Sequence, residues 1–280
     1  MDFSIFRQKD FFPSFVSQRL STIPIDYKEK YHLIKNADIL GSKQLAAGVV
    51  LLLNYKKNQN GAEYVFQLIK RSDMVLQAGD ISCPGGMLHP KTDKILSYLL
   101  ADRIISTMPD RPSTFTSKMD SENVNLVRLF LINSLREAWE EIGLNPFNIK
   151  FLGALPCYSL TLFARTIFPL VCLTPKPFEF KLSSEVEKVL EIPVSAFFEI
   201  SNYALLKIET PPGYVRPDHN NLFPCLLIHD EMGNEQILWG ATFNIIMNFL
   251  GIIAGESLPV PSSSKIIKKA LSINYITGHN

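Results

Sequence analysis

The sequence has no excess of charge of either sign. Its 280 residues include 28 lysines and arginines against 27 aspartates and glutamates, which leaves a formal net charge of +1. Basic residues do not gather in a block. A near-neutral chain of this kind lacks the long-range attraction that nucleic-acid and anionic-membrane binding depend on. We therefore expect neither nucleic acid nor a membrane as a partner.

Cysteine is scarce and scattered. The four cysteines, at positions 83, 157, 172 and 225, form no CxxC pair. This argues against a structural zinc site and against a dense disulfide framework. The N-terminus also lacks a basic region followed by a long apolar run, so we expect no secretory signal. Reduced thiols in a cytoplasmic protein are the expectation.

Long apolar runs are also few, and a single stretch, residues 237–254, approaches the length of a membrane span. Asn244 and Asn248 lie on one helical face of it, and it contains two glycines. We expect a buried helix inside a domain, because amide side chains are costly in lipid. The rest of the composition, with 46% hydrophobic and 20% charged residues, is ordinary for a globular protein.

Hydrophobic patterning predicts alternating strands and helices, which is typical of an α/β fold. Strands are expected at residues 48–55, 64–71, 151–155 and 166–173, with a hairpin formed by 223–229 and 236–239. Helices are expected at residues 93–106, from a cap at Ser121 or Asn123 to Gly143, at 184–190 and at 242–254. We divide the chain into an N-terminal arm or short helices (1–42), a main domain (43–256) and a weakly ordered tail (257–280).

The candidate chemistry is concentrated in residues 136–144, which read REAWEEIGL. On a helix, Glu137, Glu140 and Glu141 stand at i, i+3 and i+4 and so share one edge. Clustered carboxylates suit a hard divalent cation such as Mg²⁺ or Mn²⁺. Arg136 can offset part of their repulsion through Glu140, four residues on. A solvated acidic helix face is the alternative interpretation.

Together with Pro84, Gly85 and Gly86 upstream, these residues resemble the box motif of the Nudix hydrolases. The second half of the motif is complete from Arg136 to Leu144. The first half is interrupted, so that residues 87–123 form an insert, of which 108–123 is expected to be a mobile loop. The family has a further glutamate eight positions before Arg136, where this chain has Arg128. Asp120 or Glu122 could approach the site from the insert in its place, which spacing alone does not decide.

A wider resemblance points to the coenzyme A diphosphatase subfamily. Residues 68–72 (LIKRS), Gly79 and residues 83–86 (CPGG) are similar to its additional motif. A second arginine of that motif is missing, because Val75 and Leu76 occupy its neighbourhood. Residues 168–171, 184–194 and 237–242 follow the subfamily as well, so the resemblance covers about residues 45–253.

The resemblance implies a Nudix α/β/α sandwich with a mixed β-sheet between helices. It implies metal-dependent hydrolysis of a diphosphate, with coenzyme A or acyl-coenzyme A giving 3′-phospho-AMP and (acyl-)phosphopantetheine. Glu137, Glu140, Glu141 and the Gly85 carbonyl would hold Mg²⁺ or Mn²⁺. Glu137 would take the proton of the attacking water, and Arg136 would orient it.

Substrate binding is assigned by the same resemblance to Arg71, Lys70 and Gly86, with a small nucleotide as partner. Arginine suits phosphate because its planar fork matches phosphate oxygens. Asp80 is interpreted as an ordinary loop residue and Trp239 as a core residue. Two alternatives stay open: hydrolysis of another nucleotide, such as ADP-ribose or a dinucleotide, and a catalytically silent domain that binds a nucleotide or a partner. A homodimer is left open as well.

Overall fold

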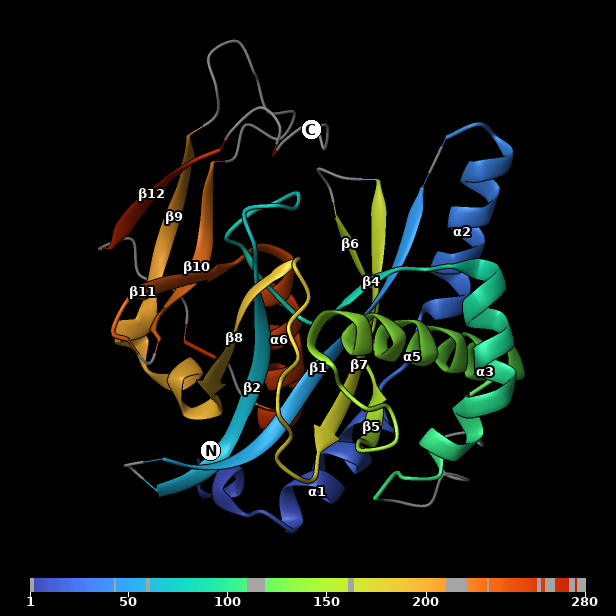
Figure 1. Ribbon diagram of the computed structural model, residues 1–280, viewed down its shortest axis with the longest axis horizontal. Helices are drawn as coiled ribbons and strands as arrows, with labels where there is room; N and C mark the ends of the chain where they lie inside the picture. The colour runs from blue at the N-terminus through green and yellow to red at the C-terminus, as the bar shows by residue number, and fades with distance from the viewer. Residues whose placement is uncertain are drawn as a thin grey trace.

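The computed structural model describes residues 3–42, 44–58, 61–109, 119–160, 164–209, 221–230, 232–255, 258–259, 265–271 and 275. At its centre is an eight-stranded mixed sheet (Figure 1). Its middle strands, β1 (Leu45–Asn58) and β7 (Arg165–Thr174), run parallel and are apolar on both faces. The other strands pair antiparallel: β2 (Gly61–Arg71), β3 (Ile81–Ser82), β4 (Gly85–Met87), β5 (Lys150–Ala154), β6 (Tyr158–Leu160) and β8 (Val186–Pro193).

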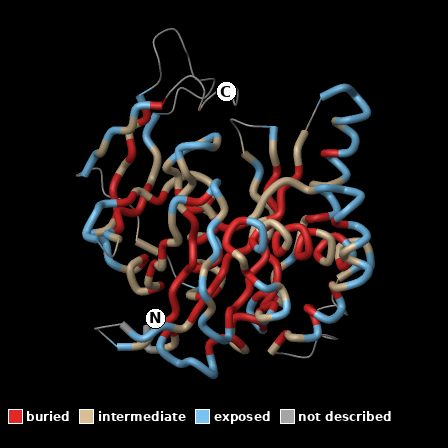
Figure 2. The backbone as a smooth tube through the Cα atoms, in the orientation of Figure 1, coloured by how far each residue is buried: buried red, intermediate tan, exposed pale blue. Residues whose placement is uncertain are grey.

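Helices cover both faces of this sheet. One face carries α2 (Tyr27–Ile39), α3 (Pro90–Ile105) and α5 (Ser121–Ile142); the other carries η1 (Phe3–Arg7), α1 (Phe11–Leu20) and α6 (Gly240–Ala254). Successive strand residues point to opposite faces, so Val50 and Leu52 pack with α5 while Leu51 and Leu53 pack on the α6 side. The buried strands between the two helical layers are visible in Figure 2. The predicted sandwich, with a mixed sheet between helices, is confirmed.

The long helix α5 begins and ends at defined residues. Its N-terminus is capped by Asp120, whose carboxylate accepts hydrogen bonds from the backbone N–H groups of Glu122 and Asn123, both at 3.0 Å. The expected cap, Ser121 or Asn123, was therefore wrong by one to three positions. Gly143, with a left-handed φ of 71°, ends the helix as predicted.

A second, four-stranded sheet was not foreseen in full. The expected hairpin is present as β10 (Leu222–His229) and β11 (Glu235–Trp239), and β9 (Tyr203–Glu209) extends it. Strand β12 (Ile266–Ala270) pairs with β9, inside the tail that was expected to be weakly ordered. Helix α6 packs between the two sheets. No helix in the described part of the chain is long and apolar enough to cross a membrane.

Of two other expected helices, one is absent and one is present. The expected helix at 184–190 is wrong, because Val186, Leu190 and Ile192 are buried with even spacing and belong to strand β8 beside β2. Short 3₁₀-helices follow it, η2 (Val194–Phe198) and η3 (Ile200–Asn202). The expected helix at 93–106 is confirmed as α3. The expected mobile loop falls mainly on residues 110–118, outside the described residues.

Candidate active site

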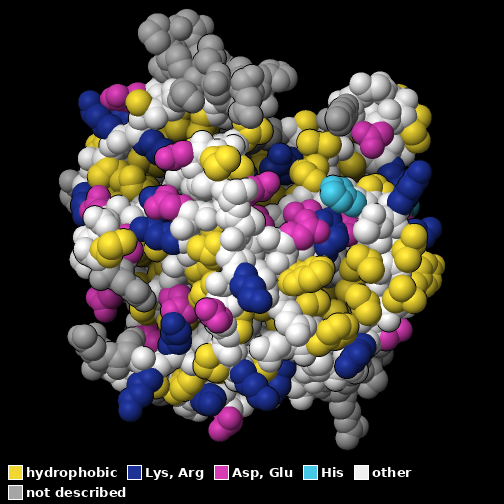
Figure 3. Space-filling view, in the orientation of Figure 1, with side chains coloured by type: hydrophobic (Ala, Val, Ile, Leu, Met, Phe, Trp, Pro, Cys, Tyr) yellow, Lys and Arg dark blue, Asp and Glu magenta, His cyan; other side chains and the backbone are white. Residues whose placement is uncertain are grey.

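A cavity of about 540 Å³ opens beside the end of α5, between β4 and the first turns of α6. Acidic and basic side chains gather on this part of the molecule, between the second sheet and α3 (Figure 3). Six residues singled out from the sequence line it: Arg71, Gly85, Gly86, Glu137, Glu140 and Glu141. Lys70 does not line it. As the strand neighbour of Arg71 it points to the opposite face, where it pairs with Glu187 at 3.0 Å.

The two glycines of β4 let the carboxylates of α5 approach the sheet. Gly85 has a φ of 143°, and a Cβ atom there would lie 2.3 Å from the Gly48 carbonyl oxygen. A Cβ atom on Gly86 would lie 2.5 Å from the Glu137 carboxylate. No other residue fits either place without displacing backbone or the catalytic candidate.

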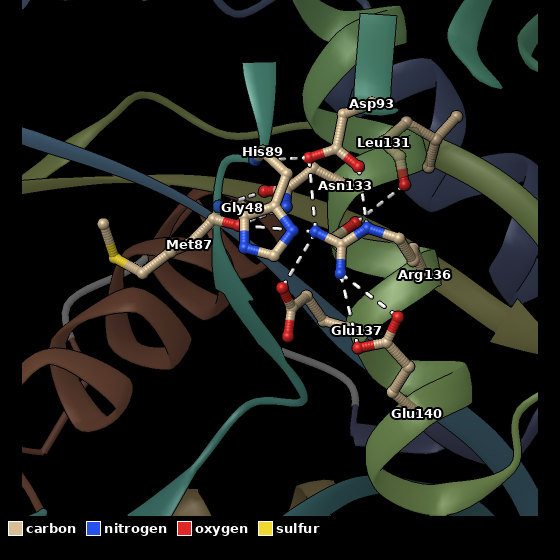
Figure 4. A network of polar contacts seen from close by, with 10 residues as sticks. Gly48, Met87, His89, Asp93, Leu131, Asn133, Arg136, Glu137 and Glu140 are labelled. Atoms are coloured by element: carbon tan, nitrogen blue, oxygen red, sulfur yellow. Dashed lines mark hydrogen bonds and ion pairs between the residues drawn. The ribbon is translucent and has the colours of Figure 1, made fainter. Parts of the chain in front are cut away.

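Arg136 is the centre of a buried polar network, drawn in Figure 4. Its Nε donates to Asp93 at 2.7 Å, and its Nη2 lies 2.9 Å from a Glu137 oxygen. Its Nη1 reaches Glu140 at 3.3 Å, which is the contact expected from the i, i+4 spacing. The Met87 carbonyl accepts a further, longer bond at 3.4 Å. The guanidinium is therefore fixed from several sides, and it fixes Glu137 in turn.

Two members of this network were missed in the sequence. Asp93, with a fully buried side chain, comes from the first turn of α3 in the insert and also accepts the His89 N–H at 2.7 Å. Asn133 accepts the Gly48 N–H at 2.8 Å and donates to the Met87 carbonyl at 2.9 Å, so it ties α5 to both β1 and β4. Asn133 lies three residues before Arg136 on the same helix, and that spacing was the available signal.

Glu141 is the carboxylate that the protein leaves least compensated. It is buried, it accepts the Gly85 N–H at 2.9 Å, and it forms no ion pair with any described residue. Burial raises its pKa to about 8, against the lowering effect of Gly85 and Arg71, while Glu137 and Glu185 raise it further. Burial also raises the pKa of Glu137, with Arg136 opposing.

Two of these carboxylates suit a divalent cation that substrate phosphates and water also bind. No three His, Cys, Asp or Glu side chains of the described ranges are grouped closely enough to enclose a metal by themselves. Mg²⁺, however, is commonly held by one or two carboxylates together with substrate phosphates and water. Glu141 and Glu137, both facing the cavity and the first lacking a cationic partner, fit that arrangement.

Asp120 and Glu122, the two insert residues considered as additional site carboxylates, do not line the cavity. Asp120 caps α5 at its far end, and Glu122 pairs there with Lys28 at 3.1 Å. Arg128, at the glutamate's position, pairs with Asp102 of α3. The insert thus supplies Asp102 to Arg128 and Asp93 to Arg136. Neither carboxylate lines the cavity.

The other side of the cavity is formed by residues whose roles the sequence did not reveal. Asp80, expected to be an ordinary loop residue, accepts bonds from Trp239 Nε1 at 3.2 Å, from Lys269 and from Tyr275. Trp239, expected in the core, lies on the cavity wall. Arg165, the first residue of β7, also lines the cavity and was not considered at all.

No family model matches the sequence, and no curated protein matches it. Among solved structures, an Ap4A hydrolase binary complex from C. elegans aligns at 14% identity and a TM-score of 0.32, over 54% of this chain and 81% of that one. A MutT/nudix family protein from Enterococcus faecalis aligns at 11% identity and a TM-score of 0.40, over 82% and 73%. The NUDIX domain of Shewanella oneidensis NrtR complexed with ADP ribose aligns at 14% and 0.30, over 57% and 84%. At these values no activity carries over to this chain.

Proposed function

We propose that this protein is a metal-dependent Nudix hydrolase that cleaves the diphosphate of a small nucleotide, with coenzyme A or acyl-coenzyme A as the first substrate class. The observation that carries the proposal is one cavity lined by two ionisable side chains of opposite type, neither of which has a described ion-pair partner. Buried Glu141 has no cationic partner there, and Arg165 has no anionic one among the described residues. A cation together with a phosphorylated ligand satisfies both.

Each residue of the carboxylate network has a task in this reaction. Glu137 accepts a proton from the attacking water, because it faces the cavity and Arg136 holds it in one orientation. The water oxygen forms a bond to one phosphorus, the bridging P–O bond breaks, and the departing phosphate keeps the electron pair. A divalent cation held by Glu137 and Glu141, with Glu140 and the Gly85 carbonyl nearby, would neutralise the diphosphate and lower the pKa of water.

The choice of coenzyme A rests on the volume and lining of the cavity as well as on the motif at residues 68–86. Its volume of about 540 Å³ lies within the usual range for small-molecule sites. Apolar and aromatic side chains also line it, among them Tyr158, Leu160, Phe223 and Ile245. Such a lining accepts a base or an acyl-pantetheine arm. The four cysteines are free thiols, which agrees with the proposed cytoplasmic location.

The test is turnover of a nucleotide panel with Mg²⁺ or Mn²⁺ and identification of the products by mass. The panel contains coenzyme A, acetyl-coenzyme A, ADP-ribose and a diadenosine polyphosphate. We expect 3′-phospho-AMP and phosphopantetheine from coenzyme A as the fastest reaction. Faster cleavage of ADP-ribose would keep the reaction type and change the substrate. Absence of turnover on every member, with binding retained, would make the protein a nucleotide-binding domain.

A further inference from the structure

Arg165 carries a charge that the protein does not neutralise. Its Nε atom is buried and has no hydrogen-bond partner, and no described residue forms an ion pair with its guanidinium. Charged groups that leave water are normally paired, because the loss of hydration is costly.

Three carboxylates of the same cavity are held by other groups. Glu137 is held by Arg136, and Glu141 accepts the Gly85 N–H. Asp80 accepts bonds from Trp239, Lys269 and Tyr275. No described carboxylate that lines the cavity, including Glu140 and Glu185, forms an ion pair with Arg165.

A second guanidinium faces the same space. Arg71, at the end of β2, lines the cavity, and its Nε donates to the Leu76 carbonyl at 2.9 Å, which restrains the side chain. Burial lowers the pKa of Arg165, and the nearby positive charge of Arg71 lowers it further. Two like charges brought together in a partly buried space repel each other, so an anion between them would stabilise both.

Arg165 also lies away from the proposed reaction centre. In the sheet it pairs with Leu45 at the start of β1, whereas Gly85, whose N–H binds Glu141, pairs with Val49. These two positions are four residues apart on one strand, which is about 13 Å in extended backbone. A group bound at Arg165 therefore lies beside the diphosphate rather than on it.

We infer that Arg165, together with Arg71, forms a subsite for a phosphate monoester of the substrate, separate from the diphosphate that is cleaved. The inference rests on the proposed function, since it takes the diphosphate to lie at Glu137 and Glu141. A phosphate monoester carries close to two negative charges at neutral pH, and two guanidinium forks match its oxygens. Substrates with such a group are selected over diphosphates that lack it.

Arg165→Met tests the subsite with a matched pair of substrates, coenzyme A and dephospho-coenzyme A, which differ only in the 3′-phosphate. We expect kcat/KM for coenzyme A to fall by about 10- to 150-fold, the effect of losing a charged hydrogen bond. The value for dephospho-coenzyme A should change less than about threefold, and Arg165→Lys should recover part of the loss. Equal losses on both substrates, or no loss on either, would overturn the inference.

The melting temperature separates a binding role from a structural one. Because Arg165 is unpaired and repelled by Arg71, Arg165→Met should melt at the same temperature as the native protein or higher. Arg103→Met, which removes an arginine from α3 away from the cavity, is the control and should leave both kcat/KM values unchanged. A large drop in melting temperature for Arg165→Met would assign this residue a structural role instead.

A binding measurement keeps the subsite apart from the proposed reaction. Adenosine 3′,5′-bisphosphate and AMP are titrated into the native protein and Arg165→Met by calorimetry, in the presence of a chelator. The native protein should bind the bisphosphate at least about tenfold more tightly than AMP, and the variant should bind the two alike. If this holds while no nucleotide is turned over, the subsite stands and the hydrolase proposal fails. If turnover occurs but the bisphosphate has no advantage, the subsite fails and the hydrolase proposal stands.

Discussion

Two arginines of this protein, Arg136 and Arg165, differ in how their charges are satisfied. Arg136 has Asp93, Glu137, Glu140 and the Met87 carbonyl around it, and its side chain is 9% exposed. Arg165 has no partner in the described part of the chain, although its Nε is buried as well. A guanidinium with several partners holds other groups in place, whereas one without partners has donors free for a ligand. The following predictions test the residues grouped around Arg136. The Arg165 variants described above test the arginine that has no described partner.

The largest effect is expected from Glu137→Gln. The amide cannot accept the proton of the attacking water and holds a cation less well, so kcat should fall by about 10²- to 10⁴-fold. Steady-state kinetics with Mg²⁺ measure the loss, and a thermal melt checks that the fold is kept. Glu140 is more than half exposed, so Glu140→Gln should lose less activity. Near-native turnover by Glu137→Gln would remove this residue from the reaction.

Asp93→Asn tests whether Arg136 depends on the insert. The pair is buried, and removing one charge from a buried pair typically costs about 3–5 kcal/mol. Arg136 keeps Glu137 and Glu140 as partners, so we expect a loss at the lower end of this range in the free energy of unfolding, measured with urea. Asp102→Asn, which affects the exposed pair with Arg128, should cost less than about 1 kcal/mol. Equal costs for the two variants would show that burial is not what distinguishes the pairs.

The two glycines of β4 should respond differently to alanine. Gly85→Ala places a Cβ atom against the backbone of Gly48 and imposes a left-handed φ, so stability should fall by about 1–3 kcal/mol or more. Gly86→Ala displaces the Glu137 carboxylate, a movable side chain, so turnover should fall with a smaller change in melting temperature. Identical melting profiles for the two variants would contradict this assignment.

We also expect a pH dependence of stability that arises from Glu141. Its pKa is raised from 4.5 to about 8 on folding, so the folded protein holds a proton that the unfolded chain releases. The stabilisation is complete below about pH 4.5 and is lost as the pH rises to about 8, with a slope of at most about 1.4 kcal/mol per pH unit. Urea titrations across this range, with a chelator present, measure the slope. Glu141→Gln should reduce it, and an unchanged slope would trace it to another group.

Local spacing predicted much of this site, and long-range pairing explains what was missed. The i, i+4 rule leads from Arg136 to Glu140, and the sequence pattern places β1, β7 and α5 correctly. Asp93 meets Arg136 across 43 positions, through the packing of α3 on α5. Arg165 reaches the cavity because β7 pairs in parallel with β1, a register that no local pattern specifies. The segment of strand β8 was expected to be a helix. Charged residues stand between its buried residues, so the alternation of a strand is hard to recognise in the sequence.

The bonds of Asp80 to Lys269 and Tyr275 join two distant parts of the chain at the wall of the cavity. Leu271 and Tyr275 belong to that wall and follow every other described residue of it along the chain. A chain shortened to end before Lys269 would therefore keep helix α5 and its carboxylates, while this side of the cavity would be open to solvent.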